Sequence, residues 1–546
     1  MASRAMPPPI RHALTVRAYS TTPRPLLLVP HARNANPLRS PCPPLGISNT
    51  AWFPTRNFAT EPTKGSEPRA SQAPDLKESA PATASATASA TASATASADS
   101  SGKAGSQSPT PSSSLSTADQ SDFDWEEKPN FDIEKFTDLP YANFGVNQHM
   151  VINQEFKEVL RQLLWRFRAP IRYAFAYGSG VFPQGTGGTA TEAEIKAVHP
   201  KAPLAVQKAQ KGAPKMIDFI FGVSHTQHWH SLNLMQHRDH YSSLGSLGSA
   251  AVSHVQDKWG AGVYFNPYVT VDGILIKYGV VNIDTLCRDL SEWDTLYLAG
   301  RLHKPVKILR DDPRVRLSNQ INLLSALRTA LLLLPSTFTE QELYATIAGI
   351  SYLGDPRMAF PTENPKKVTN IVNHNMLNFR WLYAPLVESL PNVIFNDPAC
   401  NDPDWIGKTP SVLKLQQDMD PVKRGNMVRR LPKSFRSKLY FEYQKKFQIP
   451  QLEFDKMMEA NENENTGSFK RQQGGGFEQR IAQEPPEELR KTIRDVIKKT
   501  IYWPSTSQSL KSFVTAGFSR GTRYLGEKLS KYRQGRKSDG DKESGT

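Results

Sequence analysis

Apolar residues follow regular structural periods between about residue 121 and residue 310, and they predict a mixed α/β domain there. Recurrence at helical spacing indicates a helix over residues 154–168, which Ala169-Pro170 ends because the residue before a proline avoids helical geometry. Short runs rich in β-branched and aromatic residues indicate strands. The predicted strands are residues 171–177, 216–223, 262–271, 274–281 and 304–309, and further helices are predicted from about residue 227, at 244–257 and at 283–293.

The clearest turn in this region is Asp272-Gly273, which joins two of the predicted strands. Asp-Gly between two hydrophobic runs is the strongest short-range signal for a β-hairpin. Strands that alternate with helices predict a sheet with helices packed on it.

Helical periodicity replaces the strand signals after residue 310. Thr339 is a predicted N-cap, with acidic residues in the turn that follows it. We expect residues 311–460 to form a second, mostly helical domain and the polar, Gly-rich residues 461–483 to form a linker. The predicted helices are residues 313–334, 339–352 and 364–390.

The first 120 residues lack the pattern of a folded domain. Residues 1–60 contain seven arginines and no acidic residue, a composition typical of a mitochondrial transit peptide. Residues 61–120 are dominated by Ala, Thr and Ser and offer almost no large apolar side chain to bury. We expect them to form a disordered tether.

The net charge of +15 lies at the two ends of the chain, and residues 61–488 are close to neutral. A nucleic-acid-binding protein would spread positive charge over its folded middle, so this distribution argues against that class. No apolar run approaches 18 residues, which argues against a transmembrane helix. Three scattered cysteines exclude a disulfide framework and a cysteine-based zinc site.

Residues 484–546 predict a basic amphipathic region. Between Gln508 and Arg533, apolar residues recur at near-helical spacing among six lysines and arginines and a single acidic residue. Such a helix lies on an anionic membrane surface, although a helix docked on its own domain is the alternative. The residues predicted to contact the membrane are Phe513, Phe518, Arg520, Arg523, Leu525 and Lys528.

Candidate chemistry begins where the first predicted strand meets Gly178-Ser179-Gly180, followed by Asp218 inside the next strand. Glycine lets the backbone approach a triphosphate, and N–H groups with a hydroxyl hold its oxygens. A carboxylate on a strand can fix Mg²⁺ beside the phosphates. This pairing resembles the nucleotidyltransferase superfamily of polymerase-beta type, whereas a Gly-Ser turn alone is an ordinary strand-to-helix turn.

Two features depart from the superfamily pattern. Residues 185–214 form a long insert, which we expect to be a surface loop. Ile220 stands where the superfamily has a second acidic residue, so a second metal ligand must come from elsewhere or be absent. Asp272 and Asp289 are candidates.

Lys277 is the only charged residue on its apolar strand, so it reaches water at a sheet edge or points at phosphate. Five of the twelve histidines fall between His225 and His240. We expect His230 and His240 to line a polar wall of the active site, with a solvated helix face as the alternative. A zinc site is disfavoured because no cysteine or matched spacing supports it.

Eight sequence blocks, taken together and in this order, resemble the mitochondrial phosphatidate cytidylyltransferases, also called CDP-diacylglycerol synthases. The resemblance covers residues from about 130 to 535. The blocks are NFGVNQ (143–148), AYGSGVF (176–182), DFIFGV (218–223), HWHSLNLMQHRDHYS (228–242), GAGVYFNPYV (260–269), IKYGV (276–280), LYLAGRLHKPVKI (296–308) and SYLGDPRM (351–358).

This resemblance implies a polymerase-beta-type nucleotidyltransferase domain over residues 121–310 and a winged-helix-like domain over residues 311–460. It implies a peripheral enzyme on the matrix side of the mitochondrial inner membrane. Such an enzyme makes CDP-diacylglycerol from phosphatidate and CTP with Mg²⁺, as a step towards cardiolipin. In the family the strand Asp is also followed by a hydrophobic residue at the second position, as Ile220 follows Asp218 here.

Each candidate residue then has an expected role. The family's Gly-Ser turn and strand Asp map onto Gly178, Ser179 and Asp218, and Asp218 is the predicted Mg²⁺ ligand. Asp355 and Arg357 form either a local salt bridge or part of the site. The predicted catalytic residues are Asp218, Ser179 and Lys277, the predicted nucleotide-binding residues are Gly178, Ser179, Gly180, Lys277, His230 and His240, and the predicted lipid-phosphate ligands are Arg301 and Lys304.

Two other functions remain open from the residues alone. The same superfamily core serves RNA and tRNA nucleotidyltransferases, against which the near-neutral middle of the chain argues. A non-catalytic membrane adaptor that supports protein import would have a degenerate site, against which the presence of Gly178, Ser179 and Asp218 argues.

Overall fold

The computed structural model describes residues 125–126, 128–185, 189–212, 214–359, 366–402, 405–408, 412–462, 475–517, 522 and 526. The predicted transit peptide and tether therefore lie outside the described residues. All elements below belong to one unit of the chain, Pro111–Thr546.

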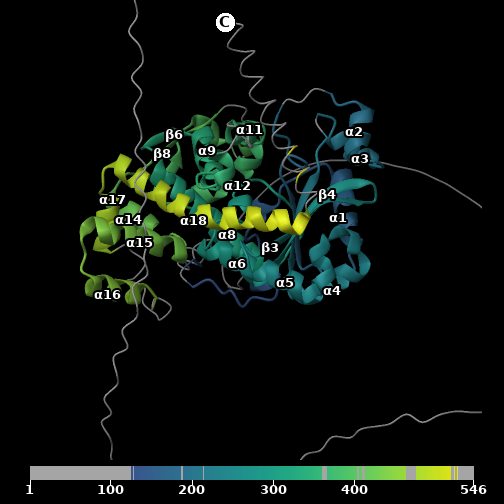
Figure 1. The fold of residues 1–546 in the computed structure, drawn as a ribbon. Coiled ribbons are helices and arrows are strands. Elements are labelled where there is room, and N and C mark those ends of the chain that lie inside the picture. The colour runs from purple at the N-terminus through teal and green to yellow at the C-terminus, as the bar shows by residue number, and fades with distance from the viewer. Residues whose placement is uncertain are drawn as a thin grey trace, which may run out of the picture. The chain divides into compact units, whose positions relative to one another are not determined.

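A five-stranded mixed sheet forms the centre of the first region (Figure 1). Its strand order is β3-β4-β2-β1-β5, with β2 and β4 parallel and the other neighbours antiparallel. Each predicted strand is confirmed near its expected position. The strands are β1 Tyr173–Tyr177, β2 Ile217–Val223, β3 Val263–Val271, β4 Ile274–Asn282 and β5 Lys307–Arg310.

The β3–β4 hairpin turns where the sequence predicts it. Asp272 and Gly273 have φ values of 48° and 77°. A two-residue turn with both φ values positive matches the right-handed twist of the strands it joins. The turn sets Val271 opposite Ile274, and a register shift in β3 between Asn266 and Val269 then places Phe265 opposite Gly279.

The register of the central strands divides the polar residues between two faces. Asp218 on β2 stands opposite Tyr177 on β1 and Lys277 on β4, so these three side chains share one face. Successive residues alternate, so Phe219 and Tyr278 point to the other side. We call these the Asp218 face and the Tyr278 face.

Seven helices of this region surround the sheet. The insert at 185–214 is not a plain surface loop, which corrects the prediction. It contains α2 and α3, and it buries Ile195, His199 and Val206, with His199 Nδ1 accepting a hydrogen bond from the backbone of Leu275 (3.0 Å). The helices are α1 Gln154–Trp165, α2 Glu192–Val198, α3 Leu204–Ala209, α4 Thr226–Gln236, α5 Gly248–Lys258, α6 Ile283–Glu292 and α7 Ala299–Leu302.

The second region is mostly helical, as predicted, but it also holds a three-stranded antiparallel sheet with the order β6-β8-β7. Its strands are β6 Thr337–Thr339, β7 Val393–Phe395 and β8 Lys414–Gln417. The helices are α8 Pro313–Leu333, α9 Glu340–Ile350, α10 Pro356–Ala359, α11 Lys367–Asn373, α12 Met376–Glu388, α13 Trp405–Lys408, α14 Pro421–Arg429, α15 Lys433–Phe447, α16 Gln451–Glu462, α17 Gly476–Ala482 and α18 Pro486–Ala516.

Helix α8 is buried along most of its length and joins the two regions. It contacts α6 and α7 of the first region and α9, α12 and α14 of the second. Thr339 caps α9 by accepting a hydrogen bond from the backbone of Glu342 (3.2 Å), as predicted. The predicted helix at 364–390 is interrupted, because α11 ends at Asn373 and α12 begins at Met376.

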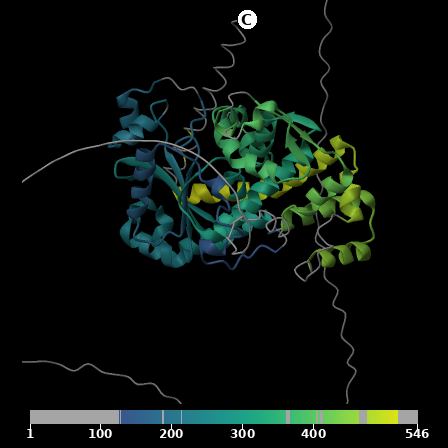
Figure 2. The same ribbon diagram turned by 180° about the vertical axis from the view of Figure 1, so that it is seen from behind.

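The C-terminal part of the chain is more ordered than the sequence suggests. α17 packs on α14 and buries Ile481, which corrects the end of the predicted linker at 461–483. α18 is 31 residues long, begins well before Gln508 and ends at Ala516, followed by Gly517 as the C-cap with a φ of 81°. It runs from α15 past α8 to β3, as the yellow helix in Figures 1 and 2 shows.

Candidate active site

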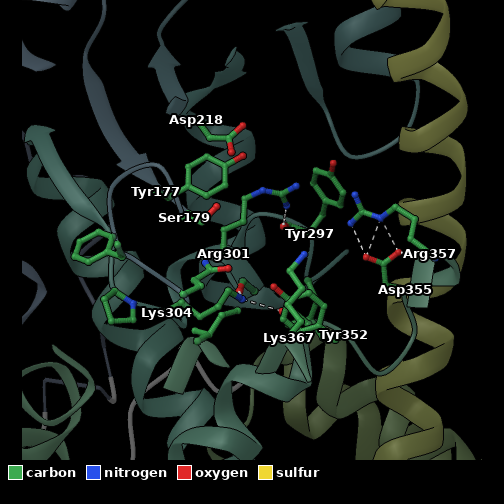
Figure 3. Close-up of a pocket in the computed structure, with 18 of the residues that line it drawn as sticks. Tyr177, Ser179, Asp218, Tyr297, Arg301, Lys304, Tyr352, Asp355, Arg357 and Lys367 are labelled. Atoms are coloured by element: carbon green, nitrogen blue, oxygen red, sulfur yellow. Dashed lines mark hydrogen bonds and ion pairs between the residues drawn. The ribbon is translucent and has the colours of Figure 1, made fainter. Parts of the chain in front are cut away.

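A cleft opens on the Asp218 face of the large sheet (Figure 3). Its walls come from the turn after β1, from β2 and β4, from α7, from the loop between α9 and α10, and from α11 and α18. Ile501 and Ser505 of α18 line it, so the C-terminal helix completes the wall. Both regions therefore contribute to one site.

The turn after β1 brings backbone close to the β2 carboxylate. Gly178 has a φ of 79°, which favours glycine, and a Cβ there would lie 3.5 Å from Asp218 Oδ2. Gly180 packs on the backbone of β2, since a Cβ there would lie 2.8 Å from the carbonyl oxygen of Met216. The structure thus brings Gly178, Ser179 and Asp218 together in the cleft.

Lys277 points at Asp218. The Nζ–Oδ1 distance is 3.7 Å, and both side chains remain partly exposed to the cleft. Because β4 lies between β3 and β2, Lys277 is not at a sheet edge, which excludes that alternative. Its Nζ also lies 4.6 Å from the centre of the Phe265 ring, a position that Gly279 permits because a Cβ there would lie 2.6 Å from that ring.

Arg301 of α7 is held between two tyrosines. Its guanidinium stacks on Tyr297, 3.9 Å from the ring centre, and donates to the Tyr297 carbonyl oxygen. It also hydrogen-bonds Tyr177, the residue directly before Gly178, and burial raises the pKa of that tyrosine. Arg301 is therefore oriented into the cleft without a carboxylate among these partners, as Figure 3 shows.

Lys304 lies on the same wall, just after α7. Its Nζ donates to the Gly300 carbonyl oxygen and to Ser351 Oγ (2.9 Å). Burial, together with repulsion from Arg301 and Lys367, lowers the pKa of Lys304 to about 7. The structure thus places both predicted lipid-phosphate ligands in the cleft.

Asp355 and Arg357 form the predicted salt bridge and also line the cleft. Arg357 Nε donates to both carboxylate oxygens of Asp355, at 2.8 and 3.0 Å. Gly354 before them packs against α18, since a Cβ there would lie 2.6 Å from the Lys498 carbonyl oxygen. The two alternatives for this pair are therefore compatible.

The structure does not bring His230 and His240 to the cleft. His230 is fully buried, with Nδ1 2.8 Å from Tyr241 Oη and Nε2 2.7 Å from Gln256 Oε1. His240 hydrogen-bonds Tyr278 Oη (2.9 Å), which identifies its position as the Tyr278 face. Burial lowers the pKa of His230 to about 4, so it is neutral. Their described contacts give no support to a nucleotide-binding role.

The histidines also do not make a convincing metal site. Among the described residues, His237, Asp239 and His240 are a group whose ligand atoms lie within 4.8 Å of one another. The rings of His237 and His240 are stacked, with centres 4.3 Å apart and planes at 5°. Their in-plane lone pairs therefore run parallel and do not converge on one ion.

The cleft itself suits a metal that binds with a nucleotide. Asp218 and Asp355 are the carboxylates among its described lining residues, and Asp355 is engaged by Arg357. Mg²⁺ is usually held by one or two carboxylates, substrate phosphates and several waters, so Asp218 alone fits this mode. Neither candidate for a second ligand lies there: Asp289 accepts backbone hydrogen bonds in the turn before α7, and Asp272 pairs with Arg166.

The predicted membrane residues are mostly beyond the structure. Phe518, Arg520, Arg523, Leu525 and Lys528 lie outside the described residues. The side chain of Phe513, on α18, is 40% exposed. Within the described part of the chain, no helix is long and apolar enough to cross a membrane.

Lys511 is one of the six basic residues of the predicted amphipathic segment 508–533, and it does not lie on a basic surface, which favours the alternative of a helix docked on its own domain. It is buried under α18, and its Nζ donates to the carbonyl oxygens of Gln256 (3.1 Å) and Trp259 (2.5 Å). Burial lowers the pKa of Lys511 to about 7. This part of α18 is docked on its own protein.

Several lining residues escaped the sequence reasoning. Tyr177 directly precedes Gly178, and Tyr297 lies four residues before Arg301. Both belong to sequence blocks that resemble the family, and this membership could have identified them. Tyr352 and Lys367 come from the second region, and only the folded chain brings them to Lys304. Tyr352 belongs to the sequence block at 351–358, whereas nothing in the local sequence distinguishes Lys367.

The sequence is similar to those of known proteins over most of the described chain. Residues 160–531 match the family described as phosphatidate cytidylyltransferase, mitochondrial. A protein of that name from Xenopus laevis is 36% identical over 373 residues, which cover 68% of this chain and 93% of the relative. Those from Schizosaccharomyces pombe and Saccharomyces cerevisiae are 43% and 42% identical over 249 and 267 residues, which cover 46% and 48% of this chain and 58% and 63% of each relative.

Proposed function

We propose, because the chain belongs to the mitochondrial phosphatidate cytidylyltransferase family, that it transfers CMP from CTP to phosphatidate and releases pyrophosphate. The observation that carries this proposal is the cleft. It places Asp218 beside the Gly178-Ser179 turn and Lys277, and it places Arg301 and Lys304 on the facing wall. Two phosphate-bearing substrates need such a concentration of cations around one carboxylate.

The fold proposal follows the same residues. We assign the five-stranded sheet to a nucleotidyltransferase domain of polymerase-beta type and the second region to a winged-helix-like domain. In support, the Gly-Ser turn and the strand carboxylate are adjacent in space, and the second region combines helices with a small antiparallel sheet.

The reaction is a single in-line displacement. An oxygen of the phosphatidate phosphate forms a bond to the α-phosphorus of CTP, and the bond from that phosphorus to the bridging oxygen of the β-phosphate breaks. Pyrophosphate leaves with the bonding electrons. Because the nucleophile is already an anion, positioning and charge neutralisation supply most of the catalysis.

Residues of the cleft have distinct tasks in this scheme. Asp218 would hold Mg²⁺, which would supply neutralisation of charge on the phosphates of CTP. Ser179 and the turn N–H groups bind phosphate oxygens, and Lys277 binds the triphosphate. Arg301 and Lys304 bind the phosphate of the lipid.

The reaction is proposed to take place on the matrix face of the inner membrane, where CDP-diacylglycerol is used for cardiolipin synthesis. The names of the relatives place them in mitochondria. The arginine-rich, acid-free leader supports import, and the basic chain beyond α18 supports peripheral binding to anionic lipid.

The test is product formation by the full chain on liposomes that contain phosphatidate, with CTP and Mg²⁺. We expect pyrophosphate release and CDP-diacylglycerol detectable by mass spectrometry, both lost in Asp218→Asn. The matched control is Asp495→Asn, an exposed carboxylate on α18 outside the cleft, which retains activity. Folded, liposome-bound wild type that makes no lipid product would overturn the proposal and favour the RNA or adaptor functions.

A further inference from the structure

Lys304 places an ammonium group in the cleft beside neutral partners. Its described hydrogen bonds go to a backbone carbonyl and to Ser351 Oγ, and its Nζ lies 5.1 Å from the centre of the Tyr352 ring. The wall around it is closely packed, since a Cβ on Gly300 would lie 2.4 Å from Ser351 Cβ. The ammonium group is thus held in position without a carboxylate among these contacts.

A second ammonium group approaches the same aromatic ring. Lys367 Nζ, at the start of α11, lies 5.3 Å from the centre of Tyr352. Figure 3 shows Lys304, Tyr352 and Lys367 grouped together, apart from Asp218, Tyr177 and Ser179. The ring keeps the two lysines in one part of the cleft, supported by cation–π attraction to each.

Among the described residues, no carboxylate forms a hydrogen bond or an ion pair with Lys304. Arg301 faces it from α7 and adds positive charge, and the neighbouring His303 is neutral because burial lowers its pKa to about 3. Asp355, on the facing loop, is bound by Arg357 in a bidentate ion pair. The cleft around Lys304 can therefore bind an anion.

We propose that Lys304 and Lys367, on either side of Tyr352, form a subsite that selects a doubly charged phosphate monoester over a singly charged phosphodiester. This rests on the proposed function and specifies how the acceptor lipid is chosen. A phosphate monoester carries about 1.5 to 2 negative charges at pH 7, whereas the diester headgroups that surround it in a membrane carry one at their phosphate. Two ammonium groups match the charge of the dianion, whereas a diester supplies charge for only one of them.

Proton uptake accompanies binding in this subsite. At pH 8 the monoester is fully dianionic, and Lys304 is largely neutral in the empty cleft because its pKa is about 7. A bound dianion favours the charged ammonium and raises that pKa, so the protein takes up a proton. Arginine at this position is charged in both states and removes the uptake without removing the cation.

The experiment titrates the full chain with dihexanoyl phosphatidate and, separately, with dihexanoyl phosphatidylglycerol, by calorimetry at pH 8 in two buffers of different ionisation heat. We expect wild type to bind the monoester at least about tenfold more tightly than the diester and to take up protons. Lys304→Met and Lys367→Met lose that preference, while Lys304→Arg retains binding without proton uptake. Lys366→Met, next to Lys367 and exposed, behaves as wild type.

CTP affinity, measured on the same variants, distinguishes this inference from the function on which it rests. Unchanged CTP affinity with lost monoester preference supports the subsite. Equal weakening of CTP in both lysine variants would overturn it and assign the pair to the nucleotide. Wild type that makes CDP-diacylglycerol but binds monoester and diester equally would also overturn it, whereas wild type that makes no product refutes the proposed function itself.

Discussion

Both faces of the large sheet carry polar and ionisable side chains. On one face these side chains line a cleft, and on the other they form buried hydrogen bonds. On the Asp218 face, Lys277, Ser179 and Arg301 line a cleft, where Lys277 Nζ lies 3.7 Å from Asp218 Oδ1. On the Tyr278 face, His230 and His240 are joined to tyrosine and amide side chains in a buried network. The first group lines a cleft, whereas the second is buried inside the protein.

This difference shows that residue type alone does not identify a site. The histidine-rich segment was the densest group of candidate chemistry in the sequence, yet its side chains hold α4 and the following turn onto the sheet. Asp218 and Lys277 are single polar residues on apolar strands, and they are the ones that face the cleft. The strand register decides which polar residues meet solvent.

The largest expected contrast comes from Asp218→Asn. The change keeps the shape of the side chain but removes the negative charge that we propose holds Mg²⁺ on the Asp218 face. We expect CDP-diacylglycerol formation to fall by at least about 100-fold, with the unfolding midpoint nearly unchanged. Steady-state kinetics and urea unfolding on the same preparation measure the rate of CDP-diacylglycerol formation and the unfolding midpoint. A variant that loses activity because it no longer folds would contradict this prediction.

On the Tyr278 face, we expect His230→Leu to lower stability and to leave catalysis unchanged. The change leaves Gln256 Oε1 without its buried partner and removes one of two hydrogen bonds at Tyr241 Oη, which still accepts from Asn233 Nδ2, so we expect unfolding to become easier by about 2–4 kcal/mol. Turnover per folded molecule stays within about twofold of wild type. A catalytic defect far larger than the loss of folded protein would contradict the structural role.

We expect acid to lower the free energy of unfolding through protonation of His230. The folded-state pKa of His230, about 4, lies below the ordinary value of 6.5, so its contribution is complete above pH 6.5 and is lost as pH falls towards 4. The loss approaches about 1.4 kcal/mol per pH unit within that window. Urea unfolding at several pH values measures it, and His230→Leu should show a shallower dependence than wild type.

The smallest effect is expected for Tyr278→Phe. Tyr278 Oη accepts a hydrogen bond from Asn233 Nδ2 (3.0 Å) and pairs with His240 Nδ1 (2.9 Å). Removing it costs about 1–2 kcal/mol of unfolding free energy and leaves kcat and KM for CTP unchanged. Chemical denaturation and steady-state kinetics report the two effects, and a change in KM for CTP would place this network closer to the nucleotide than the structure does.

The fold of the first region was largely predictable because its signals are local. Apolar runs marked the five strands, and Asp272-Gly273 marked the hairpin. The small sheet of the second region was missed because β6, β7 and β8 have only three or four residues, too few to show a period. The helices of the insert were missed because α2 and α3 are short and their buried residues are few.

The candidate site was predictable only in part. Gly178, Ser179, Asp218 and Lys277 were found because strand and turn chemistry made them unusual where they stand. Lys367 and Tyr352 meet Lys304 through contacts between the two regions, which a local pattern does not encode. Lys511 was counted among the basic residues of a predicted membrane-facing helix. Helical spacing alone does not show which side of α18 packs against the rest of the protein.

The most direct measurement follows label from [α-³²P]CTP into chloroform-extractable lipid, using the full chain, Mg²⁺ and phosphatidate liposomes. Wild type, Asp218→Asn and Tyr278→Phe are compared at equal amounts of folded protein. We expect wild type and Tyr278→Phe to label the lipid equally and Asp218→Asn to leave it unlabelled. Equal labelling by Asp218→Asn would contradict the assignment of the reaction to the Asp218 face.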